Sequence, residues 1–478
     1  MAEKETRNFT SILDGSQKVA ALDRQSLQRF TVTKDQLKQA LDSKDVASLR
    51  KYSLYFYHTS GIYRRLVDYY ANLLTFDHIL LPIDGEEAFK EKAFLKAYER
   101  QLDYIENSQI KGDSNEMVRN VIRDGAYFGY ERDLNGNFTF QHLPAEFCRS
   151  RFKIAGVATV EFDYSFFNQF RGEELEEILE AFPEEMQQGF LEYLQDRTNN
   201  RWGLLNPHFA RAHMLGDEVP IFASVLEDII DYSESKRIQK VKDELNIYKI
   251  VVQKIPLDDD GNLTFEMPEL KQFHQNLRKM VSNSNVDVVT TPCDVNLVDL
   301  QDTAQQGKDS VDGAKESVYS NAGTASILFG TSRNSGSIGL RESQRVDEML
   351  VLTILHQFEA WYKNRLAQIP GKYNFVLIFP PITHSNRDEM VKMYKEAATF
   401  GFGTKLLALA AMGISQTESN ALLEFENVFL ELNEKMIPTK SAHTQPGDGE
   451  NTKPEKDEDE LSDEGASTRD GNKNGSDK

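Results

Sequence analysis

The stretch from residue 301 to 366 constrains this chain most, because it joins a helix without an apolar face to a long helix that has one. Residues 301–320 are small and polar, so a helix there is either solvated or packed against copies of itself. Residues 321–330 form a small-residue corner with a short apolar run. Residues 331–337 (Thr-Ser-Arg-Asn-Ser-Gly-Ser) have the composition of a mobile loop with one charge.

Residues 338–366 have the apolar periodicity of a long helix. At about 1.5 Å per residue, this helix is roughly 40 Å long. Its predicted core face consists of Val346, Met349, Leu350, Ile354, Phe358, Trp361 and Tyr362, widened by Leu352 and Leu355. Trp361 and Tyr362 are also able to stack on a nucleobase, but on an apolar helix face we expect them in the core.

This succession of a polar helix, a loop and a long apolar helix resembles the stem, tunnel loop and tunnel helix of the portal proteins of tailed, siphophage-type bacteriophages. The likeness extends over about residues 50–435. It is based on Tyr-His-Thr-Ser-Gly-Ile-Tyr-Arg-Arg at 57–65, Asp-Tyr-Tyr-Ala-Asn at 68–72, Tyr-Ser-Asn at 319–321, Ile-Leu-Phe-Gly at 327–330, Ser-Ile-Gly-Leu-Arg-Glu-Ser at 337–343 and Trp-Tyr at 361–362. The alternative is an internal helical hairpin of an unrelated α+β protein.

The formal net charge of −21 argues against a tight general nucleic-acid binder, because such binding depends on Lys and Arg displacing counterions. It is compatible with a conduit in which DNA slides, since an acidic wall repels phosphates. The longest uninterrupted apolar run, residues 406–412, is far shorter than the roughly 20 residues that span a bilayer. The N-terminus lacks a signal-peptide pattern, so we expect a cytoplasmic protein with no membrane partner.

Sequence patterns of catalysis and metal binding are lacking. Cys148 and Cys293 are too few for a multi-thiolate metal site. Residues 258–262 (Asp-Asp-Asp-Gly-Asn) fit a turn rather than an EF-hand, because that alignment puts Pro256 first and Met267 twelfth. No Walker A sequence occurs. Six of the histidines are scattered along the chain and form no HExxH pair. These are His142, His208, His213, His274, His356 and His384. We therefore expect no catalytic, cofactor or metal site.

The remaining pattern predicts a mixed α+β chain. A hairpin is expected around residues 133–136, between strands at 127–132 and 137–142. Further strands are predicted at 76–83, 147–154, 157–166, 209–215, 247–255, 286–291 and 373–379, the last buried on both faces. Further helices are predicted at 62–74, 86–107, 115–127, 173–182, 184–196, 222–245, 268–281, 385–398, 403–412 and 415–436. The helix at 222–245 is expected to pair with the one at 301–320.

By the resemblance, the fold class is the α+β portal fold, with a mixed wing, helical stem, small α/β clip, long tunnel helix and helical crown. The expected segments are an N-terminal arm (1–45), the first part of the wing (46–221), a stem helix (222–245), the clip (246–298), the second stem helix and corner (299–330), the tunnel loop (331–337), the tunnel helix with the second part of the wing (338–384), the crown (385–438) and an acidic, disordered tail (439–478).

The resemblance also implies a function. The chain would form a ring of twelve at one capsid vertex of the virion, assembled in the host cytoplasm, through which double-stranded DNA is packaged and ejected. Its implied partners are the terminase large subunit, which supplies ATP chemistry, the scaffolding and major capsid proteins, and a head-completion or adaptor protein. The loop candidates are Thr331, Ser332, Arg333, Asn334, Ser335, Gly336 and Ser337. The candidates for lining the channel are Lys308, Asp309, Asp312, Lys315 and Glu316.

Two other classes of function stay open at this point. One is an intracellular nucleic-acid-processing enzyme with an inserted module at 246–298, which would require a catalytic constellation that the sequence does not display. The other is a monomeric acidic scaffold or adaptor. The mass of the native particle separates a ring from both.

Overall fold

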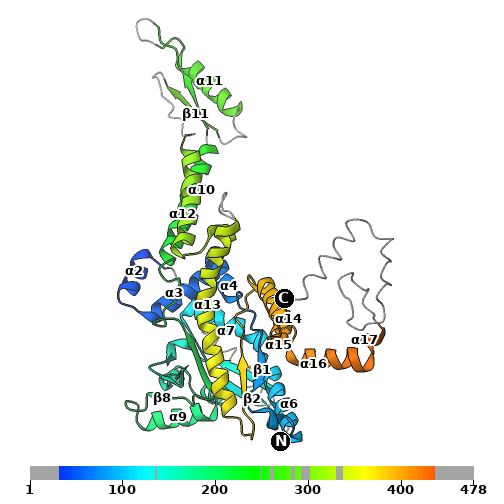
Figure 1. The fold of residues 1–478 in the computed structure, drawn as a ribbon. Coiled ribbons are helices and arrows are strands. Elements are labelled where there is room, and N and C mark those ends of the chain that lie inside the picture. Colours follow the sequence, from blue (N-terminus) through cyan, green and yellow to red (C-terminus); the bar gives the residue numbers. More distant parts are fainter. Residues whose placement is uncertain are drawn as a thin grey trace, which may run out of the picture. The chain divides into compact units, whose positions relative to one another are not determined.

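The computed structural model describes residues 32–435 apart from 135–136, 248, 259–262, 281–285, 292–301 and 330–336. The chain divides into two compact units, residues 1–419 and 420–478. The described parts combine many helices with small two- and three-stranded sheets (Figure 1). The prediction of a mixed α+β chain is therefore confirmed.

Three helices open the described chain: α2 (Lys34–Asp42), α3 (Val46–Thr59) and α4 (Gly61–Ala71). Ser60 ends α3 and caps α4 by accepting a hydrogen bond from the Tyr63 amide. The buried face of α4 is formed by Tyr63, Leu66, Val67, Tyr70 and Ala71. Within the expected N-terminal arm, Leu37 of α2 is fully buried in the same core.

Strand β1 (Ile79–Pro82) pairs with β12 (Phe375–Ile378) in an antiparallel two-stranded sheet. In β12, Phe375 and Leu377 are buried, whereas the alternate positions are half-buried. The prediction that this strand is buried on both faces is wrong, because a two-stranded sheet leaves one face of the strand only partly covered.

The predicted helix at 86–107 is divided into α5 (Glu86–Phe89) and α6 (Lys92–Asn107). The next helix, α7 (Ile110–Asp124), begins earlier and ends earlier than predicted. It ends because Gly125 adopts φ +83°, a conformation that glycine accepts readily. A Cβ atom there would lie 2.4 Å from the Glu218 carbonyl oxygen, so this backbone approach requires glycine.

The central sheet has the strand order β3 (Asn137–His142), β2 (Ala126–Leu134), β9 (Ala210–Met214), all antiparallel. The predicted hairpin is thus confirmed. Side chains alternate between the two faces of a strand, so the sheet separates two cores. Tyr127 lies in the larger core with the helices, and Phe128 lies in the smaller one.

The smaller core is covered by short elements and two helices. The predicted strands at 147–154 and 157–166 are reduced to β4 (Cys148–Arg149), β5 (Lys153–Ile154), β6 (Val157–Ala158) and β7 (Glu161–Asp163). β7 ends where Asp163 caps a 3-10 helix by accepting from the Ser165 amide. The two predicted acidic helices are confirmed as α8 (Glu173–Ala181) and α9 (Glu184–Gln195), followed by β8 (Trp202–Leu204).

Two long helices flank a small module. α10 (Leu226–Ile247) leads into β10 (Lys249–Lys254), α11 (Met267–Met280) and β11 (Val286–Thr291), and α12 (Asp302–Asn321) follows. β10 and β11 pair in parallel, and α11 packs on β11. The elements predicted for this module are confirmed, whereas the predicted turn at 258–262 falls largely outside the described residues.

The long helix α13 (Ser337–Ala367) packs against α4, β9 and β12 (Figure 1). Next come α14 (Arg387–Thr399) and α15 (Lys405–Ala411). The single helix predicted at 415–436 is wrong: α16 (Gln416–Glu424) gives way to a π-helical stretch and then to α17 (Leu432–Lys435). Glu431 has φ +52°, which interrupts the helix. The predicted tail at 439–478 lies outside the described residues.

Candidate functional site

α10 and α12 lie side by side, which confirms their predicted pairing (Figure 1). The Asp228 carboxylate on α10 accepts hydrogen bonds from Ser317 Oγ at 3.1 Å and from Asn321 Nδ2 at 2.6 Å. Among the described side chains of α12, only Val318 and Tyr319 are buried, so the rest of the contact is polar. A helix of this kind gains little from core burial and depends on such contacts for its position.

The channel-lining candidates fall on one face of α12. At 3.6 residues per turn, positions 308, 312 and 315 lie along one row, with positions 309 and 316 beside it. Ser317 and Asn321, which contact α10, lie on the opposite side of the helix. Asp312 and Glu316 are exposed and Lys315 is half-buried. The side chains of Lys308 and Asp309 lie outside the described residues.

The corner after α12 is docked on α4. Tyr319 is almost fully buried, and its ring stacks on that of Phe329, with centroids 4.6 Å apart and planes at 11°. Phe329 in turn meets the edge of Tyr69, at 5.5 Å between centroids. The Arg65 guanidinium lies 5.4 Å from the Phe329 ring centre, which adds a cation–π contact. The chain therefore reaches residue 329 in a position fixed by aromatic packing.

Of the loop candidates, residues 331–336 lie outside the described residues, and Ser337 begins α13. No side chain at positions 339–346 of α13 is buried. Val346 and Met349, predicted for the core face, are 63% and 68% exposed. The prediction is wrong for these two residues, because the buried side of the helix is polar at this level: Asp347 contacts α4, and Glu348 contacts Thr383.

Two buried carboxylates hold the first packed turn of α13. Asp347 accepts from Tyr70 Oη at 2.7 Å and from Tyr69 Oη at 3.0 Å. Glu348 accepts from Thr383 Oγ1 at 2.5 Å and also from Ser385. Burial raises the pKa of the Asp347 carboxyl, and the two tyrosine hydroxyls oppose this rise. Hydrogen bonds to buried carboxylates are strong and directional, so this turn of the helix is fixed in position.

Both flanks of residues 330–336 therefore converge on one helix. Tyr69 of α4 contacts Phe329 with its ring and Asp347 with its hydroxyl. We call these three residues, together with Tyr70, the α4 anchor. The anchor fixes the position of Phe329, directly before residues 330–336, and the position of Asp347, where α13 begins to pack on α4. The sequence does not predict the α4 anchor. A carboxylate within an apolar helix face is normally expected to face solvent.

Removal of the Tyr70 hydroxyl is expected to destabilise the protein. Tyr70→Phe leaves the buried Asp347 carboxylate with one donor fewer, and an unsatisfied buried acceptor costs about 1–3 kcal/mol. Tyr57→Phe is the matched control, since Asp68 is 31% exposed and keeps its contact with Arg119 at 2.9 Å. Urea unfolding should separate the two variants. Equal losses for both would contradict the special role of the buried contact.

The lower part of α13 packs on the central sheet. Trp361 and Tyr362 are buried, as predicted, and Trp361 Nε1 donates to the Ala210 carbonyl oxygen at 3.1 Å. Between helix and sheet lies Arg211, which is fully buried and has its guanidinium 4.4 Å from the Trp361 ring centre. Its Nε and Nη2 contact His213 Nε2 at 3.0 and 2.8 Å. Apart from the Arg-Ala-His alternation within a strand, nothing in the sequence indicates this contact.

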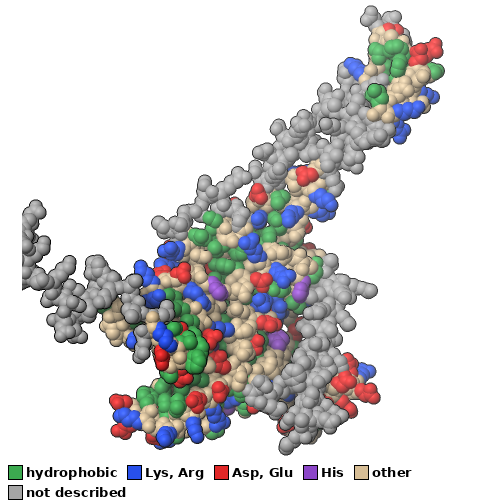
Figure 2. Space-filling view, turned by 90° about the vertical axis from the view of Figure 1, so that its right-hand side faces the viewer, with side chains coloured by type: hydrophobic (Ala, Val, Ile, Leu, Met, Phe, Trp, Pro, Cys, Tyr) green, Lys and Arg blue, Asp and Glu red, His purple; other side chains and the backbone are tan. Residues whose placement is uncertain are grey.

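Neither metal chemistry nor a membrane span is evident in the described residues. There, no group of three His, Cys, Asp or Glu side chains is arranged to hold a metal ion. None of the described helices combines the length and apolarity needed to cross a bilayer. Figure 2 shows acidic and basic side chains interspersed over the face in view, with hydrophobic patches between them. On this face the net acidity is thus spread out and forms no single acidic field.

Comparison with known proteins gives only distant likenesses. No family model matches the chain, and no curated protein matches it. A chain from the virion of a native gene transfer agent particle aligns with 77% of this chain and 93% of its own length, at 9% identity and a TM-score of 0.39. A chain from the neck of an empty particle of this kind aligns over the same shares, at 8% identity and a TM-score of 0.36.

Proposed function

We propose that this chain is the subunit of a portal ring, a conduit for double-stranded DNA at one vertex of a phage-type capsid. The α4 anchor is the observation that carries this proposal. A conduit needs a segment that can move at its narrowest point while both of its ends stay fixed. Tyr69 fixes both flanks of residues 330–336, through Phe329 on one side and Asp347 on the other.

The remaining parts fit this role. The face of α12 opposite its contact with α10 carries Asp312 and Glu316, which would line a wet channel. The module formed by β10, α11 and β11 interrupts the helix pair, so it is suited to be the clip, on which a terminase or adaptor docks. Arg333 would add one cation per subunit, a positive belt in an acidic channel. We propose no enzymatic activity: the packaging ATPase would be the partner.

The ring would also explain an exposed apolar pair on α13. Val346 and Met349 are three residues apart, so they lie on the same side of the helix. Both are largely exposed although the helix is buried farther along. Apolar side chains that the described part of their own subunit leaves exposed are typical of surfaces that contact another subunit. A neighbouring subunit is the occupant that a closed ring supplies.

Native mass spectrometry tests the proposal. A closed ring, expected to have twelve subunits, should be the dominant species. Met349→Glu is expected to reduce the ring in favour of free subunits, because it puts a charge into an apolar contact. His356→Glu, at an exposed position on the same helix, is the control and should leave the ring intact. A stable monomer or dimer under assembly-permissive conditions would favour the adaptor or the nucleic-acid-processing enzyme instead.

A further inference from the structure

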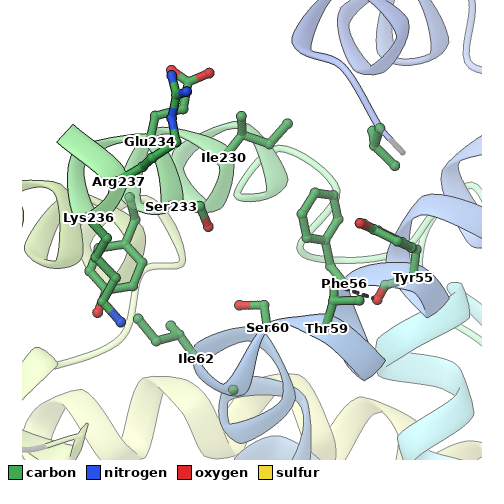
Figure 3. Close-up of a pocket in the computed structure, with 13 residues that line it drawn as sticks. Tyr55, Phe56, Thr59, Ser60, Ile62, Ile230, Ser233, Glu234, Lys236 and Arg237 are labelled. Atoms are coloured by element: carbon green, nitrogen blue, oxygen red, sulfur yellow. Dashed lines mark hydrogen bonds between the residues drawn. The ribbon is translucent and has the colours of Figure 1, made fainter. Parts of the chain in front are cut away.

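A groove of about 600 Å³ lies between the α3–α4 junction and α10 (Figure 3). In Figure 3, Ser60 and Ser233 point into this space from opposite sides, and Ile62 lies at its edge. Glu234 and Lys236 add charges of both signs to its lining. Because apolar, hydroxyl, acidic and basic groups are mixed there, the groove specifies no single class of ligand. Two exposed surfaces around the smaller core are more specific, because they complement each other.

The first surface is the outer strand of the β5–β6 hairpin. β6 is fixed in place, because Val157 is buried in the larger core and Ala158 in the smaller one. In contrast, Phe152, which directly precedes β5, and Ile154 within it are 45% and 43% exposed. The charged residues of this strand and its approach are all basic: Arg149, Arg151 and Lys153. The outer strand is therefore both apolar and basic.

The second surface is one flank of α9. Its buried face, formed by Met186, Phe190 and Tyr193, packs into the smaller core. Beside this face, Leu191 and Leu194 are 53% and 45% exposed. From the start of α8 to the end of α9 the chain has no Lys or Arg, whereas glutamates recur throughout. The flank of α9 is therefore both apolar and acidic.

The spacing of the two apolar pairs also matches. The Phe152 carbonyl oxygen accepts from the Thr159 amide at 3.0 Å, which continues the hairpin pairing by one residue. Positions 152 and 154 thus lie on one face of an extended strand, about 7 Å apart. Leu191 and Leu194 are three residues apart on a helix, so their Cβ atoms are about 5–6 Å apart. Opposite charges on the two surfaces favour this pairing over the pairing of like surfaces.

We propose that the outer strand of this hairpin docks on α9 of a second copy of the chain, with Phe152 and Ile154 against the two exposed leucines. Within one chain the surfaces are held apart: β6 packs against β9 and α13, whereas α9 packs against the 3-10 helix at residues 164–169. Two different surfaces that bind each other make a head-to-tail contact, which closes into a ring when the rotation allows it. The contact rests on the proposed function, because a ring supplies each hairpin with a neighbouring α9.

Photo-cross-linking tests this contact directly. The full-length protein would carry p-benzoylphenylalanine in place of Phe152, whose side chain is aromatic and half-exposed. We expect a species of twice the single-chain mass on a denaturing gel, with residues 184–196 of the second chain attached. The same photoreactive residue in place of Phe89, which is 47% exposed on α5, is the matched control and should not reach residues 184–196.

Native mass spectrometry of the same samples separates failure of the contact from failure of the ring. A ring in which position 152 gives no cross-link to residues 184–196 of another chain would overturn the contact and leave the proposed function standing. A cross-link to residues 184–196 in a dimer that forms no ring would support the contact and contradict the ring. A protein that stays monomeric would overturn both.

Charge substitutions provide a second test. Phe152→Asp places a carboxylate against an acidic helix, so the subunit concentration at half-assembly should rise by roughly tenfold or more. Phe89→Asp is the control and should leave this concentration unchanged. Adding Leu194→Lys to Phe152→Asp supplies a cation across the contact and should restore part of the assembly. Equal assembly of the two aspartate variants, or a further loss on adding Leu194→Lys, would contradict the docking of position 152 on α9.

Discussion

On acidification from pH 7.5 to 4.5, the folded state is expected to lose up to about 3 kcal/mol through His213 alone. The imidazole is completely buried, and its Nε2 accepts from Arg211. Burial, together with the Arg211 cation, holds the pKa of His213 well below its ordinary value of 6.5. A proton on Nε2 would place a second cation against the guanidinium and remove its acceptor.

The sign follows from proton linkage. Below pH 6.5 the unfolded chain takes up a proton on this histidine, whereas the folded chain does not until far lower pH. Acid therefore favours the unfolded state throughout this window. Asp347, whose pKa is raised by burial, acts in the opposite direction. For Glu161, burial acts to raise the pKa, but Arg151 and Arg149 outweigh it, so its contribution is lost only at lower pH.

Urea unfolding at several pH values measures the effect. His213→Gln retains an acceptor for Arg211 but cannot titrate, so its stability should depend less steeply on pH between 6.5 and 4.5. His356→Gln replaces an exposed imidazole on α13 and should have the same pH dependence as the parent protein. All three proteins must be compared at one concentration, because subunit association adds to apparent stability. Parallel curves for all three would contradict the assignment to His213.

Secondary structure can be predicted from the sequence where it depends on residues that are close along the chain. The hairpin of β2 and β3 follows from alternation around an Asn-Gly turn, and α13 follows from its apolar period. The predicted end of α7 is wrong, because Gly125 approaches the carbonyl of Glu218, a residue far along the chain. Sequence periodicity has no access to such a contact.

The candidate site was predictable only in part. The pairing of α10 with α12 follows from two helices with sparse apolar faces, and the structure confirms it. The predicted core face of α13 is partly wrong. Asp347 and Glu348 are buried, although they are acidic, whereas the apolar Val346 and Met349 are exposed. Hydrogen bonds from α4 and from Thr383 make those carboxylates tolerable in the core. The partners are distant in sequence, so the pattern gives no sign of them.

A buried carboxylate with partners distant in sequence also determines which single substitution on α13 we expect to be the most damaging. Glu131 of β2 is 2% exposed and accepts from Arg365 Nε and Nη2 at 2.9 and 2.7 Å. Its other oxygen accepts from Tyr104 Oη at 2.7 Å. Arg365→Met removes the compensating cation and leaves the carboxylate buried. Breaking one side of a buried ion pair costs about 3–5 kcal/mol, so we expect a loss of this size in urea unfolding.

A double variant distinguishes loss of the Glu131–Arg365 ion pair from loss of side-chain packing as the cause of the lower stability. In Glu131→Gln with Arg365→Met, no buried charge remains unpaired, so the double variant is expected to be more stable than Arg365→Met alone. Arg345→Met, on the same helix, is the control: its pair with Glu342 is largely exposed and is worth at most about 1 kcal/mol. If the double variant were as unstable as the sum of its single changes, Glu131 and Arg365 would act independently. The pairing of Glu131 with Arg365 would then contribute no measurable coupling to stability.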